Sequence, residues 1–221
     1  MSIAVELVGF LMCVGGWLLT GVALANDYWR VSSFSGSVIT SVWYYQNLWQ
    51  ACAEQSSGIS NCREFESLLA LPVHIQTCRA LMIIALILGL LSVILSILGL
   101  KCTKMGSMTE QTKGKMALMA GVLFILSGLC VLIAVSWYAT QVIQEFNNPL
   151  NGGIRYELGT GLYLGWSAGG LVLLGGVFLC TSFKTSQSPA QSRGYNYSTT
   201  QPQKIYRTDA PSENISSKAY I

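Results

Sequence analysis

Residues 80–100 read ALMIIALILGLLSVILSILGL, a run without a charged side chain that decides the fold class. About 20 apolar residues in a helix cross the roughly 30 Å hydrocarbon core of a bilayer. Working outward along the chain, three more such blocks occur, at about 3–24, 116–138 and 161–183. Only the first holds a charge, Glu6, close enough to its start to reach the membrane interface. We therefore predict four transmembrane helices.

The composition agrees with a membrane protein. Of 221 residues, 52% are hydrophobic and 10% are charged, whereas soluble domains are about 25% charged. The net charge of +3 is too small to indicate a nucleic-acid partner. The first apolar block lacks the basic leader of a signal peptide, so we interpret it as a membrane helix.

Basic residues mark one side of the membrane. The loop between the second and third blocks holds four lysines, and the segment after the fourth holds five of the 13 basic residues. The positive-inside rule assigns this side to the cytosol, so both termini are predicted to be cytosolic. The outer loops, at about 25–79 and 139–160, carry four arginines against six carboxylates, a net charge of −2.

The segment 184–221 is predicted to be a disordered cytosolic tail. It is rich in Ser, Thr, Gln, Pro and Tyr, and a segment with so few apolar residues cannot bury enough surface to offset its ordering entropy. The sequence ends in Tyr220 and Ile221. An apolar last residue with a free carboxylate fits the groove of a PDZ domain, so we expect a PDZ scaffold protein as a partner.

The first outer loop is too long for a plain connector, at about 55 residues. Its run 29–45 is rich in β-branched and aromatic residues, with Gly36 and Ser37 in the middle, which favours two strands and a turn. A further strand-like run follows at 47–53. We expect a small antiparallel sheet.

Cysteine placement predicts one disulfide. Cys52 and Cys62 both lie in the outer loop, in a compartment where disulfides persist, so we expect them to be joined. Cys102 and Cys180 lie near helix ends on the cytosolic side, where S-palmitoylation and an unmodified thiol are equally compatible with the sequence.

Seven residues resemble the signature of the claudin family: a Trp, a Gly/Asn-Leu-Trp triplet, two cysteines about ten apart and a basic residue before the second helix. They are Trp29, Asn47, Leu48, Trp49, Cys52, Cys62 and Arg79. The resemblance covers about 1–183 and is most similar to the paracellular-channel claudins numbered ten and fifteen. It implies a left-handed four-transmembrane-helix bundle with an extracellular five-stranded antiparallel β-sheet.

The resemblance also implies polymerisation into tight-junction strands, with this chain and other claudins as partners in cis and in trans. In claudins an apolar residue after the second cysteine enters a pocket in the second outer loop of the next molecule. Here that residue is Leu68, and the pocket would include Phe146 and Leu158. Packing of Leu68 within its own subunit is the alternative. Contact with the opposite cell is expected from Phe146, Pro149, Leu150 and Tyr156.

Fixed carboxylates in a narrow aqueous passage favour cations over anions. In cation-conducting claudins an acidic residue follows each signature cysteine. Glu64 matches one such position, whereas Glu54 precedes the other, which holds Gln55. These residues predict a cation-selective paracellular channel. The alternative is a sealing or anion-selective claudin on which they are solvated surface charges.

A different class of protein shares this topology. Four-span accessory subunits or adhesion proteins of the myelin or channel-subunit type bind a partner within their own membrane. An enzyme is not expected, because no nucleophile, phosphate-loop or metal-ligand pattern occurs, and we expect no cofactor and no metal site. The remaining expected partners are membrane lipid and inorganic ions as permeant species, at the tight junctions of the plasma membrane.

Overall fold

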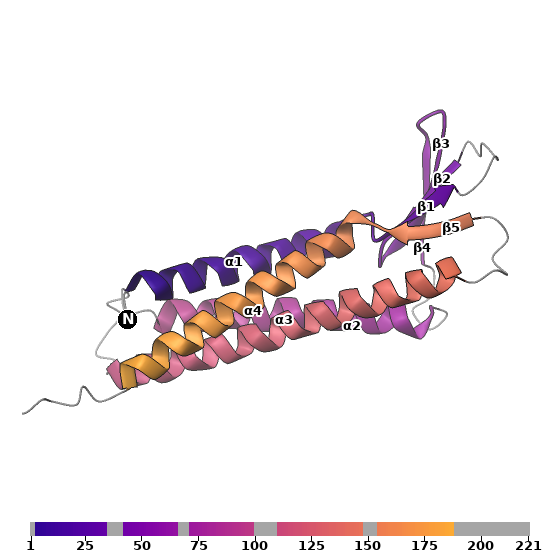
Figure 1. Ribbon diagram of the computed structural model, residues 1–221. Coiled ribbons are helices and arrows are strands. Elements are labelled where there is room, and N and C mark those ends of the chain that lie inside the picture. The colour runs from indigo at the N-terminus through magenta and orange to yellow at the C-terminus, as the bar shows by residue number, and fades with distance from the viewer. Residues whose placement is uncertain (1–2, 35–41, 66–70, 100–109, 148–153, 188–221) are drawn as a thin grey trace, which may run out of the picture. The chain divides into compact units, whose positions relative to one another are not determined.

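A computed structural model of the chain describes residues 3–34, 42–65, 71–99, 110–147 and 154–187. The helices are α1 (Ile3–Ala25), α2 (Val73–Gly99), α3 (Glu110–Asn147) and α4 (Thr160–Gln187). The strands are β1 (Arg30–Phe34), β2 (Val42–Gln46), β3 (Gln50–Gln55), β4 (Ser60–Glu64) and β5 (Ile154–Leu158). Figure 1 shows the four helices running side by side, with the strands gathered at one end of them. The predicted class, a helical membrane protein with a small antiparallel sheet, is confirmed.

All four helices are long and apolar enough to cross a membrane. Three of them continue past the predicted ends, and residues 73–79 and 139–147, predicted as loop, are helical. The added turns carry polar residues, so a criterion based on apolar length misses them, although a helix needs no apolar side chains once it leaves the hydrocarbon. Helix α4 also includes 184–187 of the predicted tail. The rest of that tail lies outside the described residues.

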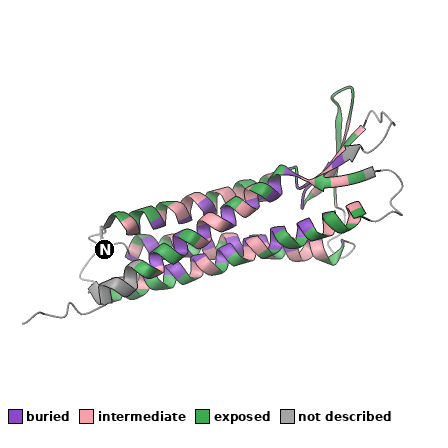
Figure 2. Cartoon of the chain, viewed as in Figure 1, coloured by how far each residue is buried: buried purple, intermediate pink, exposed green. Residues whose placement is uncertain are grey.

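Burial along α2 is the reverse of the pattern in a soluble helix, because its buried positions are mostly small or polar and its exposed positions are large and apolar. The buried set includes Ala85, Gly89, Ser92 and Ser96. The exposed set includes Ile87, Leu90, Leu91 and Ile94. Figure 2 shows exposed residues along all four helices. Small residues inside and large apolar ones outside are typical of helices that pack together in lipid.

Close approach of backbones holds the bundle together. A Cβ atom added to Gly16 of α1 would lie 2.7 Å from Val172 Cγ2 and 2.9 Å from Val172 N of α4. Hydrogen bonds cross between helices as well: Ser127 Oγ donates to the carbonyl oxygen of Ala85 at 2.8 Å. The hydrocarbon contains no water, so polar groups inside the bundle must form hydrogen bonds with other groups of the protein.

The sheet joins two distant parts of the sequence. Its strand order is β4-β3-β2-β1-β5, and every neighbouring pair is antiparallel. Strand β1 falls within the predicted run 29–45, β2 extends one residue beyond that run, and β3 extends two residues beyond the predicted run 47–53. The predicted turn at Gly36 and Ser37 lies outside the described residues. The residue pattern did not predict β4, because all five of its residues are exposed and most are polar. Pairing with β3 makes it a strand.

Adding a methyl group at Gly16 tests the contact between α1 and α4. We expect Gly16→Ala to lower the midpoint of thermal unfolding in detergent micelles by several degrees, because overpacking costs about 1–3 kcal/mol. Gly15→Ala is the matched control, since nothing lies within 4 Å of a Cβ added there. Equal midpoints for the two variants would show that this approach contributes nothing to stability.

Candidate functional site

The signature tryptophan connects the sheet to the bundle. Trp29 is completely buried, and its Nε1 donates to the carbonyl oxygen of Ala23 at 2.9 Å, near the end of α1. Its ring meets the ring of Tyr138 of α3 edge-on, with centroids 5.2 Å apart. Its backbone carbonyl accepts from the N–H of Gly159, just after β5. One residue therefore contacts α1, α3 and the end of the sheet.

Asn47 organises the turn between β2 and β3. Its Oδ1 accepts from the backbone N–H groups of Trp49 and Gln50, each at 2.7 Å. Its Nδ2 donates to Asp27 Oδ1 at 2.9 Å. Leu48, the middle residue of the turn, is completely buried and packs in the same core as Trp29. Asn therefore serves this turn as both an acceptor and a donor.

Arg79 of α2 binds the same turn from the helix bundle. Its Nε donates to the carbonyl oxygen of Leu48 at 2.5 Å. Its guanidinium lies 4.9 Å from the ring centroid of Trp49 and 5.6 Å from that of Phe65. The side chain is buried, at 8% exposure. Five of the seven signature residues, all except the two cysteines, thus lie together where the sheet meets the bundle.

The predicted disulfide is confirmed. Cys52 of β3 and Cys62 of β4 are direct partners in the antiparallel register and are bonded. Tyr45 of β2 is the next partner in the same row. Because partners in a ladder point to the same side of a sheet, the bond defines one face, which we name the disulfide face.

The register assigns the charged residues to faces. The disulfide face carries Trp43, Tyr45, Glu54, Glu64, Arg155 and Glu157. The opposite face carries Arg30, Gln46, Gln55, Arg63, Tyr156 and Leu158. The predicted charge positions Glu54 and Glu64 therefore share a face, while Gln55 points to the other side.

On the opposite face, an ion pair joins the sheet to α3. Arg30 Nη1 lies 2.5 Å from Glu145 Oε2, and Arg30 Nε donates to Gln46 Oε1 at 2.9 Å. The guanidinium also lies 4.4 Å from the ring centroid of Tyr156. The charge of Arg30 is therefore compensated within the chain.

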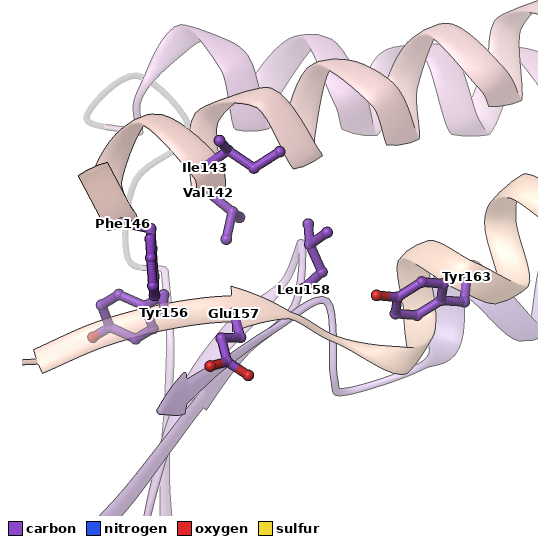
Figure 3. Close-up of a pocket in the computed structure, with 7 residues that line it drawn as sticks. All are labelled: Val142, Ile143, Phe146, Tyr156, Glu157, Leu158 and Tyr163. Carbon is purple, nitrogen blue, oxygen red and sulfur yellow. The ribbon is translucent and has the colours of Figure 1, made fainter. Parts of the chain in front are cut away.

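Beside this ion pair lies a hollow of about 290 Å³, which we name the α3–β5 hollow. It is lined by Val142, Ile143, Phe146, Tyr156, Glu157, Leu158 and Tyr163. Figure 3 shows Val142 and Phe146 pointing from α3 toward β5, while the carboxylate of Glu157 points away from α3. The predicted pocket residues Phe146 and Leu158 are brought together, and Tyr156, expected to contact the opposite cell, lies in the same hollow.

Several predicted site residues lie outside the described residues: Leu68, Cys102, Pro149, Leu150, Tyr220 and Ile221. Cys180 is described and lies inside α4, seven residues before its end. Its sulfur would be 2.6 Å from a Cβ added to Gly121, so it faces α3. S-palmitoylation of Cys180 stays a prediction, and it would require this side chain to turn outward.

Sequence reasoning missed several residues of the site. Arg30 and Glu145 were counted only as charges, since nothing in the sequence pairs positions 115 residues apart. Asp27, the partner of Asn47, was missed for the same reason. The aromatic residues Trp43 and Tyr45 did carry a signal, because positions two apart in a strand share a face.

Three features define the class of this protein as a four-span membrane protein. They are four helices of membrane-spanning length, a sheet anchored by a buried tryptophan, and a disulfide between adjacent strands. Residues 3–179 match the PMP-22/EMP/MP20/Claudin family. The chain belongs to this family.

Claudins are among its curated relatives. Claudin-15 of Mus musculus is 48% identical over 199 residues, which cover 89% of this chain and 88% of the relative. Claudin-19 of Homo sapiens is 46% identical over 189 residues, or 85% and 84% of the two chains. Claudin-4 of Bos taurus is 40% identical over 207 residues, or 93% and 99%. The protein is thus a multi-pass tight-junction claudin and not an enzyme.

Replacement of Asn47 tests the role of the turn. Asn47→Ala leaves two backbone N–H groups without their acceptor, so we expect a loss of about 2–4 kcal/mol and a lower unfolding midpoint in detergent. Gln55→Ala is the control, because that side chain is exposed at the end of β3. An unchanged midpoint for Asn47→Ala would show that the turn does not depend on this side chain.

Proposed function

We propose that the chain polymerises into tight-junction strands and forms a cation-selective paracellular channel, with the disulfide face lining the passage. In this proposal the sheet is extracellular and both termini are cytosolic, as the distribution of basic residues favours. The tail then presents Tyr220 and Ile221 to PDZ scaffold proteins in the cytosol.

The observation that supports cation selectivity is a difference between the arginines and the glutamates of the outer region: two arginines are paired or buried, whereas two glutamates are not paired within the described residues. Arg30 is paired with Glu145, and Arg79 is buried beneath the turn that Asn47 organises. Glu54 and Glu64, in contrast, make no ion pair with any other residue in the described part of the chain.

Position on the sheet adds to this imbalance. The disulfide face carries three carboxylates, with Glu157 beside the other two, and one arginine, Arg155. Arg30 and Arg63 point to the opposite face. Among the described charges, the disulfide face is therefore the more negative one. A wall of this kind raises the local concentration of cations and repels anions.

The α3–β5 hollow supports lateral assembly. It is lined mostly by apolar side chains and is open at the surface of the described chain, where Tyr163 is 55% exposed. Burying an apolar side chain from a neighbouring copy is favourable by about 25 cal/mol per Å² of apolar surface. Leu68 is the proposed donor, and Phe146 and Leu158 belong to the proposed acceptor in the next copy.

The ion selectivity is measured as a NaCl dilution potential across a tight epithelial monolayer that expresses the chain. We expect sodium to be more permeant than chloride. Glu64→Gln and Glu54→Gln each lower that preference, because each removes one fixed charge while keeping the size of the side chain. The direct readout is the ratio of sodium to chloride permeability.

A variant on the other face of the sheet serves as the control. Gln55→Glu adds a carboxylate next to Glu54 in sequence but on the opposite face, so we expect it to raise the ratio less than Glu64→Gln lowers it. A larger effect of Gln55→Glu would assign the lining to the opposite face. Chloride preference, or higher resistance without any charge preference, would contradict the cation channel.

The lateral contact is tested by a double-mutant comparison in cells that lack junctions. Leu68→Ala and Phe146→Ala each should reduce the length of strands seen by freeze-fracture, and the double variant should lose little more than either single one, because contacting residues are not additive. If Leu68 instead packs within its own subunit, Leu68→Ala will also lower the unfolding midpoint of the purified protein. Additive losses would contradict a direct contact.

A further inference from the structure

An aromatic cluster lies on the disulfide face, apart from the α3–β5 hollow. The rings of Tyr28 and Trp43 are stacked, with centroids 6.4 Å apart and planes at 27°. The ring of Tyr45 lies 5.0 Å from that of Tyr28. Tyr45 is buried, but Tyr28 is 38% exposed and Trp43 is 45% exposed. We name these three residues the aromatic cluster.

A carboxylate stands beside the cluster. Glu54 of β3 is the direct antiparallel partner of Trp43 of β2, so both side chains leave the same face of the sheet. Cβ atoms of such partners are about 4.5–5.5 Å apart. Within the described segments Glu54 makes no ion pair. The sheet therefore places an unpaired carboxylate next to an exposed indole ring.

At other aromatic rings of the protein, an arginine of the same chain makes a cation–π contact. Arg79 lies over Trp49 and Phe65, Arg30 over Tyr156 and Arg155 over Phe146, with guanidinium-to-centroid distances of 4.4–5.6 Å. The remaining described arginine, Arg63, is on the face opposite Trp43. Within the described segments, Lys113 and Lys115 lie near the start of α3, at the end of the bundle away from the sheet. In the described chain, the aromatic cluster is thus an aromatic surface that no guanidinium covers.

We propose that Tyr28, Trp43 and Glu54 form a binding site for a small organic cation of the quaternary-ammonium type. The face of an indole attracts a cation electrostatically, and a weakly hydrated cation with apolar methyl groups gains from contact with the rings as well. The carboxylate of Glu54 supplies the opposite charge. A sodium ion, which holds its water more tightly, gains less from the rings. The site shares Glu54 with the proposed wall of the passage, but all three of its residues lie on a single copy, so binding can be measured without assembly into a channel.

Binding is measured on the full-length protein in an uncharged detergent, labelled with ¹⁹F-tryptophan. The resonance of Trp43 is assigned by its loss in Trp43→Phe. We expect tetramethylammonium chloride to shift this resonance with saturation at about millimolar concentrations, as suits an exposed cation–π contact. Sodium chloride at equal ionic strength and tert-butanol, a neutral molecule of similar shape, should leave it in place.

Two variants and two controls complete the test. Glu54→Gln and Tyr28→Leu should each weaken tetramethylammonium binding by about fivefold or more. Glu64→Gln, a carboxylate on the same face but opposite Gln50, should change it little, and so should Tyr44→Leu, whose ring leaves the other face. An equal shift with tert-butanol would show an ordinary apolar patch, and an equal loss in Glu64→Gln would show diffuse charge attraction. Either result, or no shift at all, would overturn the proposal.

Discussion

Burial of Trp29 is the constraint on which the rest of the structure depends. A helix end leaves backbone carbonyl groups without partners, and the indole N–H satisfies one of these at Ala23 of α1. The same ring packs edge-on against Tyr138 of α3, so the first turn of chain after α1 is fixed to a second helix. Gly159, just after β5, lies so close to the backbone of Tyr28 and Trp29 that a Cβ atom there would clash, and a Cβ atom on Gly161 of α4 would meet the indole ring of Trp29. The start of β1 and the end of β5 are thereby attached to one point of the bundle.

The arginines explain how a sheet with nearly balanced charge presents an acidic face. Arg79 stabilises the turn at Leu48, and Arg30 joins the sheet to Glu145 of α3. Both are structural cations, and their charges are compensated or buried. The strands that carry Glu54 and Glu64 pair through backbone groups alone, so these two side chains have no structural role in the pairing. Net charge counted from the sequence therefore understates how negative the disulfide face is, because a buried or paired cation acts weakly on a distant ion.

Sequence reasoning predicted what depends on local composition. The four helices followed from apolar length, and the disulfide followed from two cysteines in one outer loop. It could not predict the ends of α2 and α3, because those turns stand outside the hydrocarbon and carry polar residues. The residue pattern also gave no sign of β4 or β5, although the family resemblance implied five strands. The five residues of β4 are exposed and form a strand only through pairing with β3. The ion pair between Arg30 and Glu145 depends on tertiary structure alone.

The register of the sheet places the lining of the α3–β5 hollow and the acidic disulfide face on opposite sides of the sheet. Along β5, Tyr156 and Leu158 line the hollow beside α3, while the carboxylate of Glu157 between them points away from α3 (Figure 3). Along β3, Glu54 shares a face with the disulfide and Gln55 does not. Because neighbouring residues of a strand alternate between faces, the apolar lining of the hollow and the carboxylates of the disulfide face can change independently by substitution at adjacent positions. A shift of one residue in the register would exchange the two faces, and the bond between Cys52 and Cys62 prevents that shift at the sheet edge, where β4 pairs with β3 alone.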